Sequence, residues 1–243
     1  MLVLGDLSMQ TARLKANGRA FAHIAEFHPE LTALRRDLHA HPELGFEEVY
    51  TARRIKEALV LCGVDAVHEN IGKTGLVAVI KGQRNTHNHM VGLRADMDAL
   101  PMTEGNDFAW KSGKSGLMHG CGHDGHVAML IGAARYLAET RRFDGTAVLI
   151  FQPGEEGFAG ARVMIEDGLF DRFPVQSVYA MHNWPAMRPG TVGINMGGHD
   201  GGGGPHHHRG QWPGWAWGPC VPDGGPGAGG RPHHHGGAEP GVA

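Results

Sequence analysis

The sequence predicts an α/β fold, a three-layer sandwich in which helices cover a mostly parallel sheet. Two amphipathic segments come first, and short apolar runs then alternate with a further helical pattern as far as residue 181. Such alternation is typical of βαβ units, which place functional groups at the carboxyl ends of parallel strands. The chain has 243 residues, of which 41% are apolar, and this is enough for a buried core.

Apolar residues at helical spacing predict three helices. The first two are marked by Leu31, Leu34 and Leu38, and by Val49, Ala52, Ile55 and Leu59. The third runs from Val127 to Leu137 and starts just after a cluster of cysteine and histidine. Each helix has one apolar face, so each is expected to cover a sheet.

Four short apolar runs, at residues 76–80, 90–95, 146–151 and 178–181, predict buried strands. Polar residues follow three of them directly: Asp96 and Asp98, then Glu155 and Glu156, then His182. Because the carboxyl ends of parallel strands meet at one edge, we expect these side chains to lie close together.

The composition divides the chain into three parts. We expect residues 1–27 to be an N-terminal extension, residues 28–197 to form one folded domain, and residues 198–243 to be a disordered tail. Gly, Pro and His dominate the tail, which therefore cannot build a core. Its composition indicates a GC-rich message read in a shifted frame, and a natural low-complexity linker is the alternative.

Charge and cysteine usage exclude several classes of protein. The formal net charge of -3 and the absence of a basic run argue against nucleic acid as a partner. No apolar stretch approaches the roughly 20 residues of a membrane helix, and no secretory signal is recognisable. The three cysteines are far apart, which argues against a disulfide framework. A cytoplasmic location is expected.

A Cys-x-His block predicts metal ligands. In Cys121-Gly122-His123-Asp124-Gly125-His126, a thiolate and an imidazole two residues apart can share one ion. The alternative is a buried cysteine beside a helix-capping histidine. The glycines favour the ligand interpretation, because they let the backbone bend closely around an ion. We expect Asp124 to support an imidazole, and His119 and His126 to be supporting or surface groups.

Adjacent carboxylates in Gln152-Pro153-Gly154-Glu155-Glu156-Gly157 predict the second half of the site. Glu155 and Glu156 would repel each other unless a positive charge lies nearby, and a divalent metal supplies one. Glu156 could then bind the ion while Glu155 takes a proton from water. A solvated pair of glutamates in a loop is the alternative.

Asp96 and Asp98 are two residues apart, so in an extended segment they point the same way and one could support a ligand. A polar turn before Pro101 is the alternative for this pair. His182 is a lone histidine at the end of its strand, and it is the weakest single signal of the set.

Five motifs in order carry a resemblance: RRDLHAHPELGFEE, GLRADMDALPM, HGCGHDGH, FQPGEEG and MHNWP. Over Leu31 to Met196 the chain resembles the hippurate hydrolase and indole-acetyl-amino-acid amidohydrolase branch of the aminoacylase and carboxypeptidase metallopeptidase family. The resemblance implies two divalent metal ions, Zn, Mn or Co. It also implies that Cys121, His123, Glu156 and His182 are ligands, that Glu155 is the catalytic base and that Asp98 is a supporting catalytic acid.

The activity that the resemblance implies is hydrolysis of small N-acyl amino acids, such as hippurate, to a carboxylic acid and an amino acid. In the family a lid domain, through which the proteins homodimerise, follows the equivalent of Gly197, and a last histidine ligand follows that domain. Neither is found in this sequence, so the resemblance implies that residues 28–197 form an incomplete metallohydrolase catalytic domain. An inactive metal-binding remnant is the alternative. A His-rich metal-storage protein is a third interpretation, based on the tail alone.

Overall fold

A five-stranded sheet in the order β2-β3-β5-β4-β6 is the centre of the computed structural model, which describes residues 11–12, 18–185 and 190–193. The strands are β2 (Ala66–Glu69), β3 (Leu76–Lys81), β4 (Met90–Asp96), β5 (Thr146–Gln152) and β6 (Ser177–Ala180). The helices are α1 (Gly18–Ala40), α2 (Val49–Cys62), α3 (His123–Thr140), α4 (Gly160–Glu166) and α5 (Leu169–Arg172). The pair β1 (Thr11–Ala12) and β7 (Val192–Gly193) is antiparallel.

The sheet is mixed, although the α/β class is as predicted. Strands β4, β5 and β6 are parallel, whereas β3 is antiparallel to β5 and β2 is antiparallel to β3. Only six residues connect β2 to β3, and a connection this short allows only an antiparallel pair. The three parallel strands are the ones that lead to the polar residues predicted to form a site.

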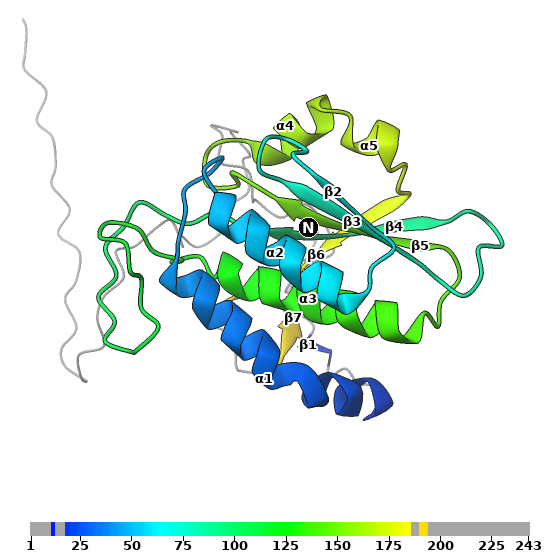
Figure 1. Cartoon of the computed structure of the whole chain (residues 1–243), viewed down its shortest axis with the longest axis horizontal. Coiled ribbons are helices and arrows are strands. Elements are labelled where there is room, and N and C mark those ends of the chain that lie inside the picture. The colour runs from blue at the N-terminus through cyan, green and yellow to red at the C-terminus, as the bar shows by residue number, and fades with distance from the viewer. Residues whose placement is uncertain (1–10, 13–17, 186–189, 194–243) are drawn as a thin grey trace, which may run out of the picture. The chain divides into compact units, whose positions relative to one another are not determined.

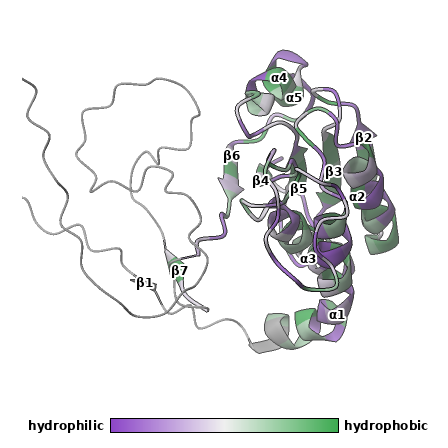
Figure 2. Cartoon of the chain, turned by 90° about the vertical axis from the view of Figure 1, so that its left-hand side faces the viewer, coloured by the Kyte–Doolittle hydropathy of each residue, from purple (hydrophilic) through white to green (hydrophobic). Residues whose placement is uncertain are grey.

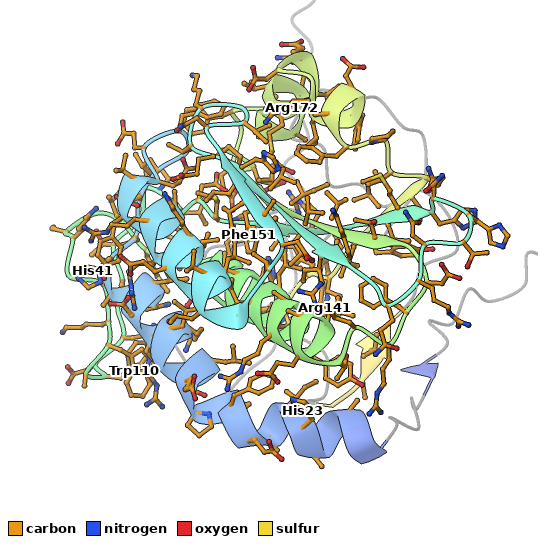
Figure 3. All side chains as sticks on the ribbon, turned by 45° about the vertical axis from the view of Figure 1, so that its right-hand side comes forward. His23, His41, Trp110, Arg141, Phe151 and Arg172 are labelled. Atoms are coloured by element: carbon orange, nitrogen blue, oxygen red, sulfur yellow. The ribbon has the colours of Figure 1, made fainter. Side chains whose placement is uncertain are left out.

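Helices cover both faces of the sheet, which gives the expected three layers (Figures 1 and 2). On one face α1, α2 and α3 enclose an apolar core, in which Phe151 of β5 is fully buried near the middle of the molecule (Figure 3). On the other face α4 and α5 cover a smaller cluster built around Val148, Ile150 and Met164. The apolar runs of β3 and β5 are therefore buried on both faces.

Of the two domain boundaries expected from the sequence, at residues 28 and 198, only the first lies within the described residues. Helix α1 begins at Gly18, so the predicted start of the domain at residue 28 falls inside this helix. The segment 198–243 lies outside the described residues. Among the helices that the structure describes, none combines the length and the hydropathy needed to cross a lipid bilayer.

An ionic clamp joins α1 to α2. Asp37 of α1 accepts hydrogen bonds from Arg54 Nε at 2.7 Å and from the Tyr50 hydroxyl at 2.8 Å. Burial alone would raise the pKa of Asp37, but the bonds from Arg54 and Tyr50 hold it below its usual value. The clamp therefore stabilises the packing of the two helices while Asp37 is ionised.

We expect the core against α2 to dominate the stability of the fold. Ile55 is fully buried, so Ile55→Ala should lower the free energy of unfolding by about 2–5 kcal/mol. Leu61 on the same helix is 88% exposed, so Leu61→Ala should change it by no more than about 0.5 kcal/mol. Urea unfolding followed by circular dichroism measures both, and equal losses would contradict the assignment of the buried face.

The clamp should make stability depend on pH. A carboxyl whose pKa is lowered by folding stabilises the fold above its unfolded pKa of about 4, and this contribution is lost as pH falls through the folded pKa. Asp37→Asn should therefore cost up to about 1 kcal/mol at pH 7. Unfolding of both proteins at a series of pH values should show the difference shrinking below about pH 4. A difference independent of pH would rule out the ionic role.

Candidate metal and catalytic centre

The carboxyl ends of β4, β5 and β6 meet at one edge of the sheet and carry the predicted polar residues. Asp96, the last residue of β4, lies opposite Gln152, the last residue of β5. Glu155 and Glu156 follow β5 by a few residues, and His182 follows β6. Helix α3 begins at the same edge with His123. The parallel strands thus bring together residues that are far apart in the sequence.

Two groups of potential ligand atoms meet at His123. One consists of Cys121, His123 and His182, the other of His123, Glu155 and Glu156, and within each group the atoms lie within 4.8 Å of one another. Cys121 Sγ is 3.5 Å from His182 Nε2, and His123 Nε2 is 3.7 Å from Glu156 Oε1. All five residues predicted as ligands or base are therefore gathered in one place.

Asp98 determines how His123 faces this site. The Nδ1 of His123 donates a hydrogen bond to Asp98 Oδ1 at 3.2 Å, so that in the neutral ring Nε2 carries the lone pair. Asp98 Oδ2 accepts a hydrogen bond from the backbone N–H of Glu156 at 2.9 Å. A single buried carboxylate thus holds both an imidazole and the glutamate loop.

The donor atoms fit a metal ion. Among the described residues, His123 Nε2 and Glu156 Oε1 are buried without a hydrogen-bond partner, although nearly all buried polar atoms have one. The two atoms face each other, and when the imidazole is neutral, as a metal ligand must be, both are acceptors and neither can satisfy the other. A cation between them would satisfy both, and the thiolate, imidazole and carboxylate set suits a divalent transition metal.

The electrostatics of the site favour a positive charge. Burial and the neighbouring charge of Glu156 raise the pKa of Glu155, and burial raises the pKa of Glu156. Burial alone would lower the pKa of His123, but hydrogen bonds with Asp98 and Cys121 and the charge of Asp96 raise it to about 11. Without an ion, the raised pKa keeps a proton on His123 beside these poorly solvated carboxylates, and a divalent ion would supply the positive charge in its place.

Histidine 182 presents one nitrogen to the site. Its Nδ1 donates a hydrogen bond to the carbonyl oxygen of Asn183 at 2.6 Å, which leaves Nε2 facing Cys121. The side chain is exposed, in contrast to the fully buried His123. Gly122, with a φ of 85°, lies so close to Asn183 that a Cβ would be 2.9 Å from the side-chain nitrogen. Glycine at 122 therefore allows the two halves of the site to approach.

His126 takes the supporting role, one of the two that the sequence left open for it. Its Nδ1 donates a hydrogen bond to Asp96 Oδ1 at 2.6 Å, and its Nε2 accepts one from the backbone N–H of Asn183 at 2.8 Å. Both ring nitrogens are occupied, so His126 is not free to bind an ion even though it lies in a third ligand group with Asp96 and His123. It is only 2% exposed, so the surface position allowed by the sequence is wrong.

Behind the site, His39 joins α1 to α3. Its Nδ1 lies 2.8 Å from Asp124 Oδ2, and its Nε2 lies 3.0 Å from Glu104 Oε1. The hydrogen bond with Asp124 raises the pKa of His39, although burial opposes the shift. His119 is also buried here, and burial lowers its pKa to about 4, so its ring is neutral. Only the position of His39 in a motif could have indicated its role.

An α/β sheet whose strand ends gather thiolate, imidazole and carboxylate groups around unsatisfied buried acceptors is typical of metal-binding proteins. Residues 92–239 match the Peptidase family M20/M25/M40. The chain belongs to this family.

Two curated relatives and one solved structure illustrate the similarity. The chain is 46% identical to a hippurate hydrolase of Campylobacter jejuni, over 67% of this chain and 41% of that protein. It is 41% identical to an N-acetylcysteine deacetylase of Bacillus subtilis, over 70% and 44%. A dinuclear metal binding peptidase of the M20 family from Bacillus subtilis is 41% identical, with a TM-score of 0.62 over 67% of this chain and 44% of that one. The chain thus spans less than half the length of these relatives.

Metal binding should stabilise the folded chain. When free Zn²⁺ or Mn²⁺ exceeds its Kd about 100-fold, binding adds about 2.7 kcal/mol and raises the melting temperature, and a chelator should reverse the shift. Cys121→Ala should lose most of this shift, whereas Cys62→Ala should keep it, because Cys62 belongs to none of the ligand groups. Histidines 206–208 and 233–235 are present in all three proteins, so the difference reports on Cys121.

Differential scanning fluorimetry with and without metal measures these shifts. An equal metal-dependent shift in all three proteins would show that the ions bind elsewhere.

Proposed function

We propose that this chain is a metal-dependent amidohydrolase that cleaves N-acyl amino acids to a carboxylic acid and a free amino acid. The observation that carries the proposal is the meeting of the two ligand groups at His123, with Glu155 beside them. A thiolate and imidazole on one side and paired carboxylates on the other suit two ions and one proton-accepting group. The dinuclear metal binding relative from Bacillus subtilis supports the same interpretation.

The two ions would be held by Cys121, His123, Glu156 and His182. Zinc, manganese or cobalt would suit this mixed set of sulfur, nitrogen and oxygen ligands. The ions would polarise the amide carbonyl and lower the pKa of water to about 7. Asp98 contributes through the groups it contacts, because it orients His123 and fixes the backbone at Glu156. We assign it a supporting role.

Glu155 is the proposed catalytic base. It is partly buried, and its Oε2 lies 3.9 Å from His123 Nε2. Its carboxylate accepts a proton from the attacking water as the water oxygen bonds to the amide carbon. The same proton then passes to the leaving nitrogen as the carbon–nitrogen bond breaks. One water is consumed, and a carboxylic acid and an amine are formed.

Hippurate-like substrates are the proposed class. The relatives include a hippurate hydrolase, an N-acetylcysteine deacetylase and an IAA-amino acid hydrolase of Arabidopsis thaliana, the last at 40% identity over 72% of this chain. These names share an acyl group joined to an amino acid and differ in the acyl group. They therefore support the amide of a small N-acyl amino acid. A reducing compartment such as the cytoplasm would keep Cys121 as a thiol.

Replacing the base should abolish turnover while leaving the site assembled. With Zn²⁺, Mn²⁺ or Co²⁺ supplied, Glu155→Gln should lower kcat for hippurate by about 10²–10⁴-fold, because the amide cannot accept the proton. Glu166→Gln, on the exposed face of α4, should leave kcat unchanged. Release of glycine from hippurate measures the rate.

Two controls sharpen this test. Glu155→Gln should still show the metal-dependent rise in melting temperature, which separates loss of the base from loss of the ion. Equal rates in Glu155→Gln and the unaltered chain would refute Glu155 as the base. Metal binding without turnover of hippurate, N-acetylcysteine or an indole-acetyl amino acid would instead support a metal-binding protein without this activity.

A further inference from the structure

Glu48 is a buried carboxylate that the proposed reaction does not use. Its side chain is fully buried, and it forms no salt bridge with the described residues. Burial raises its pKa, while hydrogen bonds from Thr74 and from backbone groups, including that of Gly154, oppose the shift. A buried acid without a cation is costly, so its partners indicate what it does.

Capping of α2 does not explain Glu48. It occupies the N-cap position but makes no side-chain hydrogen bond to its own helix. Glu43 makes those bonds instead, because its two oxygens accept the backbone N–H groups of Tyr50 at 3.0 Å and Thr51 at 2.9 Å. The carboxylate of Glu48 is therefore available for another segment.

That segment is the loop that carries the proposed base. Glu48 Oε1 accepts a hydrogen bond from the backbone N–H of Gly154 at 2.9 Å, and Oε2 accepts one from the Thr74 hydroxyl at 2.5 Å. Gly154 directly precedes Glu155 and has a φ of 56°. On the other side of Glu155, the N–H of Glu156 is held by Asp98. Two carboxylates from different elements thus hold the amides that flank Glu155.

Close packing reinforces this attachment. A Cβ on Gly45 would lie 2.9 Å from Gly154 Cα and 2.5 Å from the Phe158 ring. The rings of Phe46 and Phe158 meet edge to face, with their centroids 5.9 Å apart. The turn before α2 and the loop after β5 therefore lie against each other, with the carboxylate of Glu48 between them.

We propose that Glu48 is a positioning residue that fixes the Gly154–Glu156 backbone and so aims Glu155 and Glu156 at the site. The proposal rests on the function proposed above for Glu155 and Glu156. A displacement of about 1 Å at a reacting group can lower the rate about 100-fold. The hydrogen bond between Glu48 and Gly154, one residue before Glu155, can therefore affect the rate strongly. The loop requires Glu48 to accept the hydrogen bond from Gly154 N–H, and it does not require the negative charge of the carboxylate.

Three variants separate these roles. Glu48→Ala removes both acceptors. Glu48→Gln keeps an acceptor for Gly154 N–H and offers an amide donor to the Thr74 oxygen, so it should rescue the loop. Glu47→Ala alters the exposed neighbour and is the matched control.

Amide exchange of the metal-free chain, followed by NMR, tests the attachment without any activity. In the unaltered chain the Gly154 amide should exchange slowly. In Glu48→Ala the exchange rate of the Gly154 amide should rise at least about 10-fold relative to that of the core amide of Leu149. In Glu48→Gln and Glu47→Ala the ratio of these two exchange rates should stay as it is in the unaltered chain. Fast exchange of Gly154 in the unaltered chain would overturn the proposal, even if Glu48→Ala fails to fold.

Metal affinity and kinetics give the second readout. Glu48→Ala should weaken Zn²⁺ binding or lower kcat by about 10–100-fold with KM little changed, and Glu48→Gln should restore both. A lower melting temperature with unchanged Gly154 exchange ratio, affinity and kcat would show a merely structural role. If no variant, including the unaltered chain, turns over hippurate, the proposed function fails while amide exchange still decides the role of Glu48.

Discussion

The Asp98 carboxylate holds two separate segments of chain with its two oxygens, one through the imidazole of His123 and the other through the backbone amide of Glu156. It is 1% exposed and lies beyond the end of β4. Its position therefore depends on the parallel pairing that brings β4 beside β5 and α3 over both. Because Nδ1 of His123 is bound to Asp98, Nε2 is the nitrogen that faces the glutamates, and it is the one without a proton when the ring is neutral. The ligand chemistry follows from this tautomer.

The same arrangement concentrates negative charge in a poorly solvated place, which costs stability until a cation is present. The surrounding structure offsets part of the cost. Arg94 donates a hydrogen bond to Asp96 at 2.7 Å and another to the Gln152 side chain at 2.8 Å, which joins the ends of β4 and β5. The apolar cores on both faces of the sheet supply the rest of the stability. Unfavourable electrostatics at one edge of an otherwise stable fold are typical of a functional site.

Local patterns in the sequence predicted the three long helices α1, α2 and α3 but not α4 and α5. They also predicted four of the five sheet strands and the gathering of Cys121, His123, Glu155, Glu156 and His182. Each of these predictions depends on a short-range signal in the sequence, either the period of the apolar residues or a reactive side chain at the end of an apolar run. Strand β2 and the mixed sheet were not predicted, because Ala66–Glu69 is short and only partly buried. Its place depends on pairing with β3 and not on its own composition.

The partners of two supporting residues, Glu48 and His39, escaped prediction for a related reason. Glu48 meets Gly154 across 106 positions, and His39 meets Asp124 across 85 positions. In the sequence Glu48 is one of two glutamates before a helix, and nothing local distinguishes it from Glu47. Only the fold shows that Glu47 is exposed and that Glu48 is buried against the loop after β5. The chemistry of such residues is set by long-range contacts, which no local pattern encodes.

The two halves of the candidate centre differ in how firmly the fold holds them. His123 and the backbone of Glu156 are fixed by Asp98, and the loop before Glu156 is also bound to Glu48. His182, by contrast, is exposed and follows β6, which among the described residues pairs only with β4. The buried half is therefore preorganised, and an ion seated there would present its remaining charge to the exposed half. The exposed half is positioned through the neighbours of its ligands, because Gly122 packs against Asn183 and the backbone N–H of Asn183 is bound to the buried His126.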